Sequence, residues 1–359
     1  MHTGISLYPG LDGTAAEHLS LLKQASALGI RRLFTSLHIP EANKSAQRQE
    51  LHQLLAAARA HDMDVIADIS PQTTALLGID RLQPQVLLDL GITTARLDYG
   101  FSVEKTALFS RIMPIQLNAS TLQPSYLQAL QHAGADFSHI DCLHNFYPRP
   151  HTGLSPAYAA QQTHWLQEKG LSVGAFIASQ TGRRGPLYEG LPTLEMHRRM
   201  DVSLASRHLA AMGMQSVFIG DSHPSAAELE SLARTGREEK HVVVLKAHLL
   251  SQDPFIRDLL SYTFTARLDA AQDVIRTQES RSHVGSHIIT ADGPQRPLQY
   301  GDITIDNHEF QRYMGEIQII QKPLPAEPRT NIAAHILPEE QFLLPYITPG
   351  RKFRLEWVR

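Results

Sequence analysis

The feature that most constrains the fold is an alternation of strand-like and helix-like segments, which repeats eight times within residues 1–236. Short apolar runs are typical of buried parallel strands, and the segments between them carry apolar residues at helical spacing. The predicted strands are 4–8, 32–37, 64–69, 94–97, 114–117, 138–143, 172–177 and 216–220. The predicted helices are 15–28, 46–61, 84–90, 105–112, 125–133, 156–169, 194–212 and 226–234.

Eight such units in this length match a (β/α)8 barrel, and a doubly wound sheet is the alternative. The strand ends favour the barrel, because polar residues follow every predicted strand. Barrel enzymes build their sites from the carboxyl ends of all their strands, whereas a doubly wound sheet needs polar ends only at one crevice. We therefore predict an α/β fold with an N-terminal (β/α)8 barrel.

The alternation stops after Gly236, where a charged, linker-like stretch begins. The remaining sequence is rich in turn residues and contains short strand-like runs at 242–245, 288–290, 303–305, 316–320, 331–336 and 353–358. A chain of 359 residues is also long for a single core. We therefore predict two domains, a barrel at 1–236 and a small β-rich domain at 240–359.

Composition excludes several functional classes. The net charge is −3, without the basic stripe that nucleic-acid or membrane-surface binding needs. No apolar run approaches the roughly 18 residues of a membrane helix. Cys142 is the single cysteine, which rules out an internal disulfide or a cysteine metal cluster. The N-terminal residues lack the features of a signal peptide, so we expect a cytoplasmic enzyme. The sequence also lacks a GxGxxG, Walker A or HExxH motif, and we expect no cofactor and no metal.

The run at 144–155 (HNFYPRPHTGLS) follows the sixth predicted strand and is rich in polar and aromatic side chains. Its prolines fix the backbone, so the polar groups can be aimed at low entropic cost. Aromatic faces beside amide and guanidinium donors suit a sugar ring with an anionic group. The candidate binding residues here are His144, Asn145, Tyr147 and Arg149. The alternative is a proline-rich connecting loop.

Carboxylates at strand ends are the candidate catalytic groups. Glycoside hydrolysis needs one carboxyl that protonates the leaving oxygen and a second that serves as nucleophile or base. We predict Asp98, after the fourth strand, and Glu189, in the glycine- and proline-rich loop after the seventh, as the first pair, with Glu189 the acid. Glu41 and Asp221 are the reserve pair. A salt bridge, a helix cap (for Asp221 above all) or a solvated loop position (for Glu189) is the structural alternative.

The other candidate ligands are arginines and strand-end polar groups. Arg96, Arg149, Arg183 and its neighbour Arg184 carry guanidinium groups that could bind a phosphate or a carboxylate. For Arg96, which lies inside a strand, a structural ion pair is the alternative. His38 and Asn118 follow predicted strands, where they could bind sugar hydroxyls, although a lone strand-end histidine is more often structural.

Several motifs occur in order along the chain. In the predicted barrel they are 34–41 (FTSLHIPE), 96–101 (RLDYGF), 118–121 (NAST), 144–155, 186–195 (PLYEGLPTLE) and 219–221 (IGD). In the second domain they are 302–307 (DITIDN) and 312–316 (RYMGE). Together they resemble the bacterial 6-phospho-N-acetylmuramidase family over nearly the whole chain.

The resemblance implies a TIM barrel followed by a cyclophilin-like β domain. It also implies cytoplasmic hydrolysis of N-acetylmuramic acid 6-phosphate-(β1,4)-N-acetylglucosamine to its two monosaccharides in cell-wall recycling. The expected ligand is then a 6-phosphorylated muramyl disaccharide. Arg312 of the second domain is a candidate further anion ligand, with an ion pair to Glu316 or another acid as the alternative.

Other functions stay open at the level of the sequence. A retaining, inverting or substrate-assisted reaction is compatible with the carboxylates. A phosphosugar aldolase or epimerase would need a strand-end lysine, which no predicted strand has, or metal ligands such as His38, Glu41, Asp68 and His144. A non-catalytic sugar-phosphate binding protein is the third class. The sequence also leaves open whether the chain forms a homo-oligomer.

Overall fold

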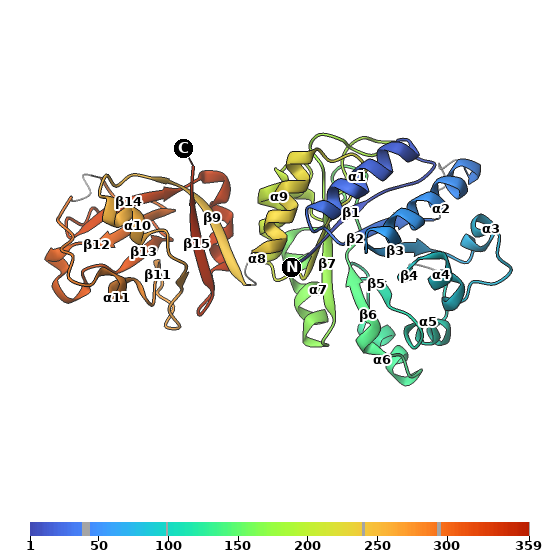
Figure 1. The fold of residues 1–359 in the computed structure, drawn as a ribbon. Coiled ribbons are helices and arrows are strands. Elements are labelled where there is room, and N and C mark those ends of the chain that lie inside the picture. The colour runs from blue at the N-terminus through green and yellow to red at the C-terminus, as the bar shows by residue number, and fades with distance from the viewer. Residues whose placement is uncertain (38–43, 98–99, 239–240, 293–295, 359) are drawn as a thin grey trace. The chain divides into compact units, whose positions relative to one another are not determined.

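The structure, a computed structural model, describes residues 1–37, 44–97, 100–238, 241–292 and 296–358. Its chain forms two compact units, Met1–Glu238 and Glu239–Arg359. Figure 1 shows the first unit as strands surrounded by helices and the second as a sheet with a few short helices. The fold class predicted from the alternation of strands and helices is confirmed.

The first unit is a closed barrel of eight parallel strands, in which β1 pairs with β8 to complete the circle. The strands are β1 (His2–Ser6), β2 (Arg32–Ser36), β3 (Asp64–Ile69), β4 (Thr94–Leu97), β5 (Ile115–Asn118), β6 (Ile140–Leu143), β7 (Ser172–Ile177) and β8 (Ser216–Ile219). The helices are α1 (Ala15–Ala27), α2 (Lys44–Ala60), α3 (Thr73–Leu77), α4 (Pro84–Leu90), α5 (Val103–Ser110), α6 (Pro124–His132), α7 (Pro156–Glu168), α8 (Val202–Ala211) and α9 (Ala226–Arg237).

Helix starts in the barrel follow from local sequence. Thr14 begins α1 with a capping box to Glu17, and Ser225 begins α9 with a capping box to Glu228. Ser102 caps α5 through its side chain. Each cap satisfies backbone N–H groups that the first helical turn leaves without a partner. These caps fix where the connections after β1, β4 and β8 end, and so the lengths of these three loops at the barrel's carboxyl end.

The barrel interior is packed with side chains. Large apolar residues that are at most 2% exposed form a cluster there: Tyr8, Phe34, Ile66, Leu143, Phe176, Leu191 and Phe218. Gly4 makes room for one of them, because a Cβ atom at this position would lie 2.2 Å from the Phe218 ring. The alternate residues of the strands, such as Ile5, Leu33 and Val65, join the core under the helices. Both faces of each strand are therefore buried, which explains the nearly continuous apolar runs.

The second unit is a seven-stranded mixed sheet in the order β10-β15-β9-β14-β12-β13-β11. Its strands are β9 (Val242–Leu249), β10 (Phe264–Thr265), β11 (Val274–Arg276), β12 (Asp302–Asp306), β13 (Ile317–Ile320), β14 (Thr330–Ile336) and β15 (Lys352–Trp357). Two short helices accompany them among the described residues, α10 (Pro254–Leu259) and α11 (Ser280–Val284). β15 runs parallel to β9, and the other pairs are antiparallel.

Two predicted elements are wrong. The predicted helix 194–212 is a 3₁₀ turn (Glu195–His197) followed by α8, because Asp201 caps α8 through two backbone N–H groups and so starts a new helix. The predicted strand 288–290 does not form. Its carbonyl oxygens at Ile289 and Thr290 accept from the His308 backbone and the Asn331 side chain rather than from a strand.

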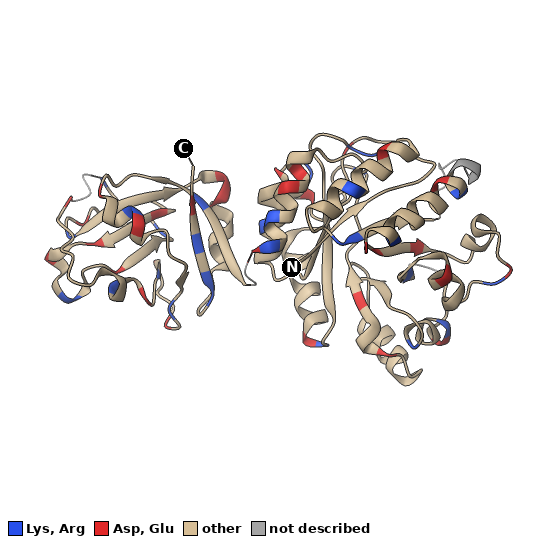
Figure 2. Cartoon of the chain, in the orientation of Figure 1, with Lys and Arg blue, Asp and Glu red and all other residues tan. Residues whose placement is uncertain are grey.

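Charge is spread over both units. Figure 2 shows basic and acidic residues interspersed on the helices of the barrel and on the second sheet. Among the described residues, no helix has the length and apolar character needed to cross a bilayer.

Candidate active site

The carboxyl ends of the barrel strands meet at one end, which is the end where barrel enzymes carry their sites. Of the predicted site residues, His38, Glu41 and Asp98 lie outside the described residues. The described ones on the barrel gather around Arg96, along the 144–155 run and on the loop that joins β7 to α8.

Arg96 lies inside the barrel, where the residue is 2% exposed. Its terminal nitrogens donate to the Leu143 carbonyl oxygen at 2.9 Å and to Asn145 Oδ1 at 2.6 Å. Its Nε lies 4.0 Å from Asp68 Oδ1. The structure thus brings the predicted Arg96 and Asn145 together. Because Oδ1 of Asn145 accepts from the guanidinium, the amide nitrogen is the atom left to donate to a ligand.

A line of polar side chains continues from Arg96 through the barrel. Gln116 Oε1 lies 3.5 Å from an Arg96 nitrogen, and Gln116 Nε2 donates to Asp141 Oδ1 at 2.9 Å. Arg32 donates to Asp141 Oδ2 at 2.7 Å. Such a buried network rigidifies the groups at its end. The partners of Arg96 on both sides favour a role in positioning Asn145 over direct binding of an anion.

Ser120 connects the predicted residues Asn118, His144 and Asn145. Its backbone N–H donates to Asn118 Oδ1 at 3.0 Å, and its hydroxyl accepts from the Asn145 N–H at 2.9 Å and lies 3.2 Å from His144 Nδ1. His144 Nε2 lies 3.1 Å from the Thr163 hydroxyl. Burial lowers the pKa of His144 to about 3. His144 is therefore a neutral, fully buried residue, and its position favours a structural role over contact with a sugar hydroxyl.

The Glu195 carboxylate ties the 144–155 run to the loop after β7. It accepts from the backbone N–H of His151 at 2.9 Å and of Gly153 at 2.8 Å. It also forms a two-pronged ion pair with Arg198, with both N···O distances 2.7 Å. The Arg198 hydrogen bonds, followed by those two backbone N–H groups, lower the pKa of Glu195 to about 2. The negative charge is thus built into the loop structure.

Arg198 holds the same two segments through carbonyl oxygens. It donates to Tyr147 O at 2.9 Å and Arg149 O at 3.2 Å, and to Gly190 O at 3.0 Å on the loop after β7. The Tyr147 side chain is half-buried, and burial raises its pKa. The Arg149 side chain is exposed. The backbone of Arg149 is therefore fixed while its guanidinium stays accessible.

Asp221 anchors the loop after β7 from the end of β8. Its carboxylate, 0% exposed, accepts from the backbone N–H of Ser179 at 2.9 Å, of Arg184 at 2.9 Å and of Leu191 at 3.2 Å. Burial raises the pKa of Asp221, and the three N–H groups oppose that effect. The helix-cap alternative for Asp221 is wrong, since Ser225 caps α9.

The neighbouring arginines of this loop differ in their surroundings. Arg183 donates to the carbonyl oxygens of Ser179 at 3.4 Å and Arg198 at 3.2 Å, and to Gln180 Oε1 at 3.1 Å. The Arg184 guanidinium carbon instead lies 4.4 Å from the centre of the Tyr8 ring. The geometry therefore points to Arg184, more than to Arg183, as a ligand-binding cation.

Glu189 lies on the same loop, with its side chain 38% exposed and one carboxylate oxygen 3.9 Å from Arg199. Its carbonyl oxygen accepts from Arg198 at 3.3 Å. The backbone that carries this candidate acid is therefore held, and its carboxyl is accessible to a ligand. The preceding Tyr188 has a φ of +56° and a side chain open to solvent.

Asp12, after β1, is a carboxylate that the sequence pattern did not single out. Its Oδ2 lies 3.4 Å from the Gly185 N–H and 3.3 Å from the Ser222 hydroxyl. Its Oδ1 lies 3.5 Å from His223 Nε2. In the sequence, Asp12 lies between Leu11 and Gly13 and is indistinguishable from an ordinary turn residue. Its place in the connection after the first strand is the one sequence signal that could have marked it as a candidate.

Arg312 lies in the second unit, on a 3₁₀ segment (His308–Tyr313). Its guanidinium donates to the Tyr313 hydroxyl at 2.8 Å and lies 4.9 Å from the centre of that ring. Glu316 pairs with Arg276 and Arg281. Nothing in the contacts of Arg312 within this unit distinguishes it as an anion ligand.

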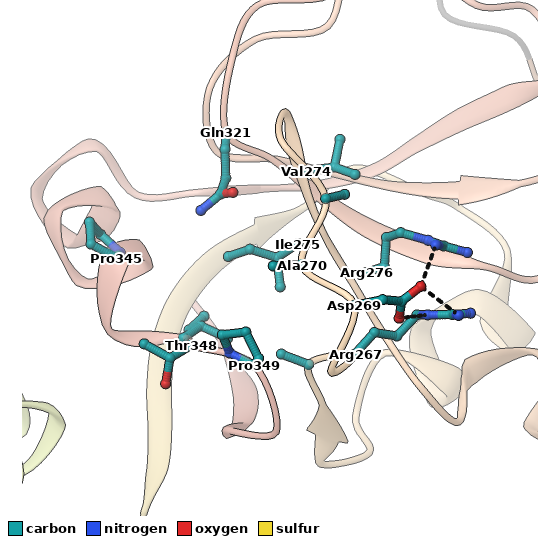
Figure 3. Close-up of a pocket in the computed structure, with 13 residues that line it drawn as sticks. Arg267, Asp269, Ala270, Val274, Ile275, Arg276, Gln321, Pro345, Thr348 and Pro349 are labelled. Carbon is teal, nitrogen blue, oxygen red and sulfur yellow. Dashed lines mark hydrogen bonds and ion pairs between the residues drawn. The ribbon is translucent and has the colours of Figure 1, made fainter.

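The second unit also contains a cavity of about 210 Å³, bordered by residues around β11 and by residues 345–349. Figure 3 shows Arg267 and Arg276 at one side of it, both joined to Asp269. Arg276 also pairs with Glu316. Carboxylates of the chain already neutralise these arginines, which argues against an anion site here.

Among the described residues, no group of three or more histidine, cysteine, aspartate or glutamate side chains could hold a metal ion. Of the candidate metal ligands, Asp68 lies beside Arg96, and His144 has both ring nitrogens next to hydroxyl groups.

These features define a (β/α)8-barrel protein with polar and aromatic side chains at the carboxyl ends of its strands and a separate mixed-sheet unit. The family model for the N-terminal part of 6-phospho-N-acetylmuramidase matches residues 3–234, and the model for its C-terminal part matches residues 243–356. The chain belongs to the 6-phospho-N-acetylmuramidase family, as its motifs indicate, and the name of this family denotes a glycosidase.

Two solved structures are similar over the whole chain. An uncharacterised B. cereus protein is 28% identical with a TM-score of 0.86, and the match covers 99% of each chain. A conserved Enterococcus faecalis protein of unknown function is 34% identical with a TM-score of 0.69, over 99% of this chain and 96% of that one. A search of curated proteins found no match.

Proposed function

We propose that this protein hydrolyses N-acetylmuramic acid 6-phosphate-(β1,4)-N-acetylglucosamine to its two monosaccharides, in the cytoplasm, during cell-wall recycling. The observation that carries the proposal is the match of both parts of the 6-phospho-N-acetylmuramidase family to consecutive segments of this chain. The barrel's carboxyl end supports it, because carboxylates, amide donors and guanidinium groups are positioned there around aromatic rings.

The reaction adds water across the glycosidic bond. An acid protonates the oxygen that leaves with N-acetylglucosamine, and the muramoyl C1 is attacked either by a carboxylate or by a water that a carboxylate activates. We propose Glu189 as the acid and Asp98 as the second carboxylate. The exposed carboxyl of Glu189 on a held backbone supports its part.

The second predicted carboxylate pair is Glu41, which lies outside the described residues, and Asp221. The Asp221 carboxylate is occupied by three backbone N–H groups, which supports a positioning role for it rather than proton transfer. Asp221 would then act through the loop that carries Glu189.

Three of the remaining predicted ligands, Asn145, Tyr147 and Arg149, serve substrate binding in this proposal. Asn145 would donate to a sugar hydroxyl from its amide nitrogen, oriented by Arg96. Arg149 would bind one anionic group of the substrate, since its exposed side chain extends from a fixed backbone. Tyr147, held at its carbonyl oxygen by Arg198, would form part of the wall of the subsite.

The test is incubation of the purified chain with the phosphorylated disaccharide, followed by mass spectrometry of the products. We expect N-acetylmuramic acid 6-phosphate and N-acetylglucosamine in equal amounts, and much slower cleavage of the disaccharide without phosphate. Binding without products would support a non-catalytic sugar-phosphate protein. Cleavage lost on chelation and restored by a divalent metal would support a metal-dependent barrel enzyme.

A further inference from the structure

Arg184 is a buried cation at the carboxyl end of the barrel, and the residue is only 7% exposed. Its guanidinium carbon lies 4.4 Å from the centre of the Tyr8 ring and 5.3 Å from that of Phe146. Both rings belong to, or pack against, the aromatic cluster inside the barrel. Tyr8 in turn donates its hydroxyl hydrogen to Gly220 O at 2.8 Å, so the surface under the guanidinium is fixed.

Arg184 opposes, through the charge of its guanidinium, the rise that burial causes in the pKa of the nearby Asp221. Its Nε donates to the Gly185 carbonyl oxygen at 3.1 Å, and no carboxylate among the described residues forms an ion pair with it. Asp221 accepts from the Arg184 backbone N–H rather than from its side chain. An arginine stays protonated at any physiological pH, so a buried guanidinium that lacks a described carboxylate in contact gains stabilisation when a ligand supplies an anion there.

Three other arginines of the candidate site, Arg96, Arg183 and Arg198, have more acceptors within the protein than Arg184 has. Arg198 forms a two-pronged ion pair with Glu195, and Arg96 lies 4.0 Å from Asp68 and donates to Asn145. Arg183 donates to carbonyl and amide oxygens of its own loop and of Arg198. Each of these guanidinium groups has acceptors within the protein. Arg184 combines deep burial with an absence of described carboxylate partners.

Hydrogen bonds also hold the backbone at Arg184 and Gly185. Asp221 Oδ1 accepts from the Arg184 N–H at 2.9 Å, and Asp12 Oδ2 lies 3.4 Å from the N–H of Gly185. The guanidinium is therefore presented by residues from the ends of β8 and β1, not by a freely moving loop. Such preorganisation is what an anion subsite requires, because little entropy is lost when the ligand binds.

We propose that Arg184 is the ligand of an anionic group on the muramoyl sugar, with Tyr8 and Phe146 as the aromatic floor of that subsite. This inference rests on the proposed function for the identity of the sugar. The sugar carries a phosphate and a lactyl carboxylate, and both suit the planar fork of a guanidinium. Arg149, exposed at the rim, is then available for the other anion.

The test measures binding of three monosaccharides by calorimetry to the wild type, to Arg184→Met and to Arg184→Lys. The ligands are N-acetylmuramic acid 6-phosphate, N-acetylmuramic acid, which lacks the phosphate, and N-acetylglucosamine 6-phosphate, which lacks the carboxylate. We expect Arg184→Met to weaken binding of the first ligand by about 10–100-fold, as loss of a charge-assisted contact does. Arg184→Lys should recover part of that loss.

The two partial ligands identify the anion. If Arg184 binds phosphate, Arg184→Met also weakens binding of N-acetylglucosamine 6-phosphate and leaves N-acetylmuramic acid unchanged; if it binds the carboxylate, the pattern is reversed. Arg31→Met is the matched control, because Arg31 lies before β2 at the opposite end of the barrel and donates to Ser26. Its affinities should equal those of the wild type.

Equal affinities of the wild type and Arg184→Met for all three ligands would overturn the inference. Circular dichroism and thermal unfolding check the fold, and Arg184→Lys, which keeps the charge, carries the test if Arg184→Met does not fold. The outcome is separate from that of the proposed function. A wild type that binds the monosaccharides through Arg184 but cleaves no disaccharide would refute the function alone.

Discussion

Glu195 and Arg198 lie three residues apart and form a two-pronged ion pair, with N···O distances of 2.7 Å. The Glu195 carboxylate accepts from the backbone N–H of His151, and the Arg198 guanidinium donates to the carbonyl oxygen of Gly190. One ion pair therefore joins the two segments that carry most of the described candidate ligands. An acidic residue in a first helical turn usually only complements the helix dipole, but Glu195 also closes a loop.

We expect Glu195→Gln to loosen the 144–155 run without unfolding the barrel. The amide cannot accept from Arg198 and from two backbone N–H groups as a carboxylate does, and its NH₂ would face donors. The free energy of unfolding should fall by about 1–2 kcal/mol at pH 7. Urea unfolding measures this change, with Glu168→Gln on α7 as the exposed control. Equal destabilisation by both variants would contradict the role of Glu195.

The effect of Glu195 should depend on pH in a defined direction. Its pKa is about 2 in the folded chain and 4.5 in the absence of partners, so folding favours the ionised form. The stabilisation is complete above pH 4.5 and is lost as the pH falls from 4.5 towards 2. The difference in stability between wild type and Glu195→Gln should shrink over that window. A constant difference would show that the carboxylate charge is not the cause.

The buried His144 should cause a second loss of stability on acidification, at a higher pH than that of Glu195. Burial lowers its pKa from 6.5 to about 3, so the folded chain keeps the ring neutral while the unfolded chain takes up a proton. Stability is therefore lost as the pH falls below 6.5, by up to about 2 kcal/mol at pH 5 for one such histidine. His197 and His208, which are also buried with lowered pKa values, add to this loss.

Urea unfolding of the barrel at pH 7 and pH 5 measures the slope. We expect His144→Gln to be less stable than the wild type at pH 7, because Ser120 and Thr163 lose partners, but to lose less stability on acidification. Exposed His164 provides the matched control, and His164→Gln should keep the full slope. An unchanged slope in His144→Gln would mean that the ring is protonated in the fold or is not the group that titrates.

The sequence predicted the barrel because its determinants are local and repeated. Caps such as Ser102 and the buried apolar runs act within a few residues, so each strand end was located closely. The polar residues after those ends were therefore assigned to one face. What the sequence could not show was which of them face a ligand and which hold the backbone. In the sequence, Asp221 and His144 resemble catalytic groups at strand ends. Their hydrogen-bond partners, Leu191 and Thr163, are distant along the chain, so the sequence did not reveal these structural contacts.

Arg149→Ala should affect binding of the phosphorylated substrate with little effect on stability. The side chain is exposed, so its removal should change the free energy of unfolding by less than about 0.5 kcal/mol. If it binds an anion of the substrate, KM should rise roughly tenfold or more for the phosphorylated disaccharide. Steady-state kinetics with both disaccharides provide the measurement. Unchanged discrimination between them would reject a role for Arg149 at the phosphate.

Asp98→Asn and Glu189→Gln test the proposed catalytic pair. Loss of a general acid or of its partner carboxylate lowers kcat by roughly 10²–10⁴-fold. If Glu189 is the acid, its variant should also lose the alkaline limb of the pH–rate profile, because that limb reports loss of the proton that the leaving oxygen needs. Near-normal turnover in both variants would exclude the pair and leave Asp12 and Asp68 as the next described carboxylates to test at this end of the barrel.

The stereochemistry of the product then constrains the geometry at Asp98. Proton NMR of the first-formed N-acetylmuramic acid 6-phosphate distinguishes the β from the α anomer before mutarotation. Retention requires a carboxylate close enough to bond to C1, with the pair about 5–5.5 Å apart, whereas inversion needs about 6.5–9.5 Å for a water between them. Retention with full activity in Asp98→Asn would point instead to the N-acetyl group as the nucleophile, in which case the second carboxylate only orients the amide.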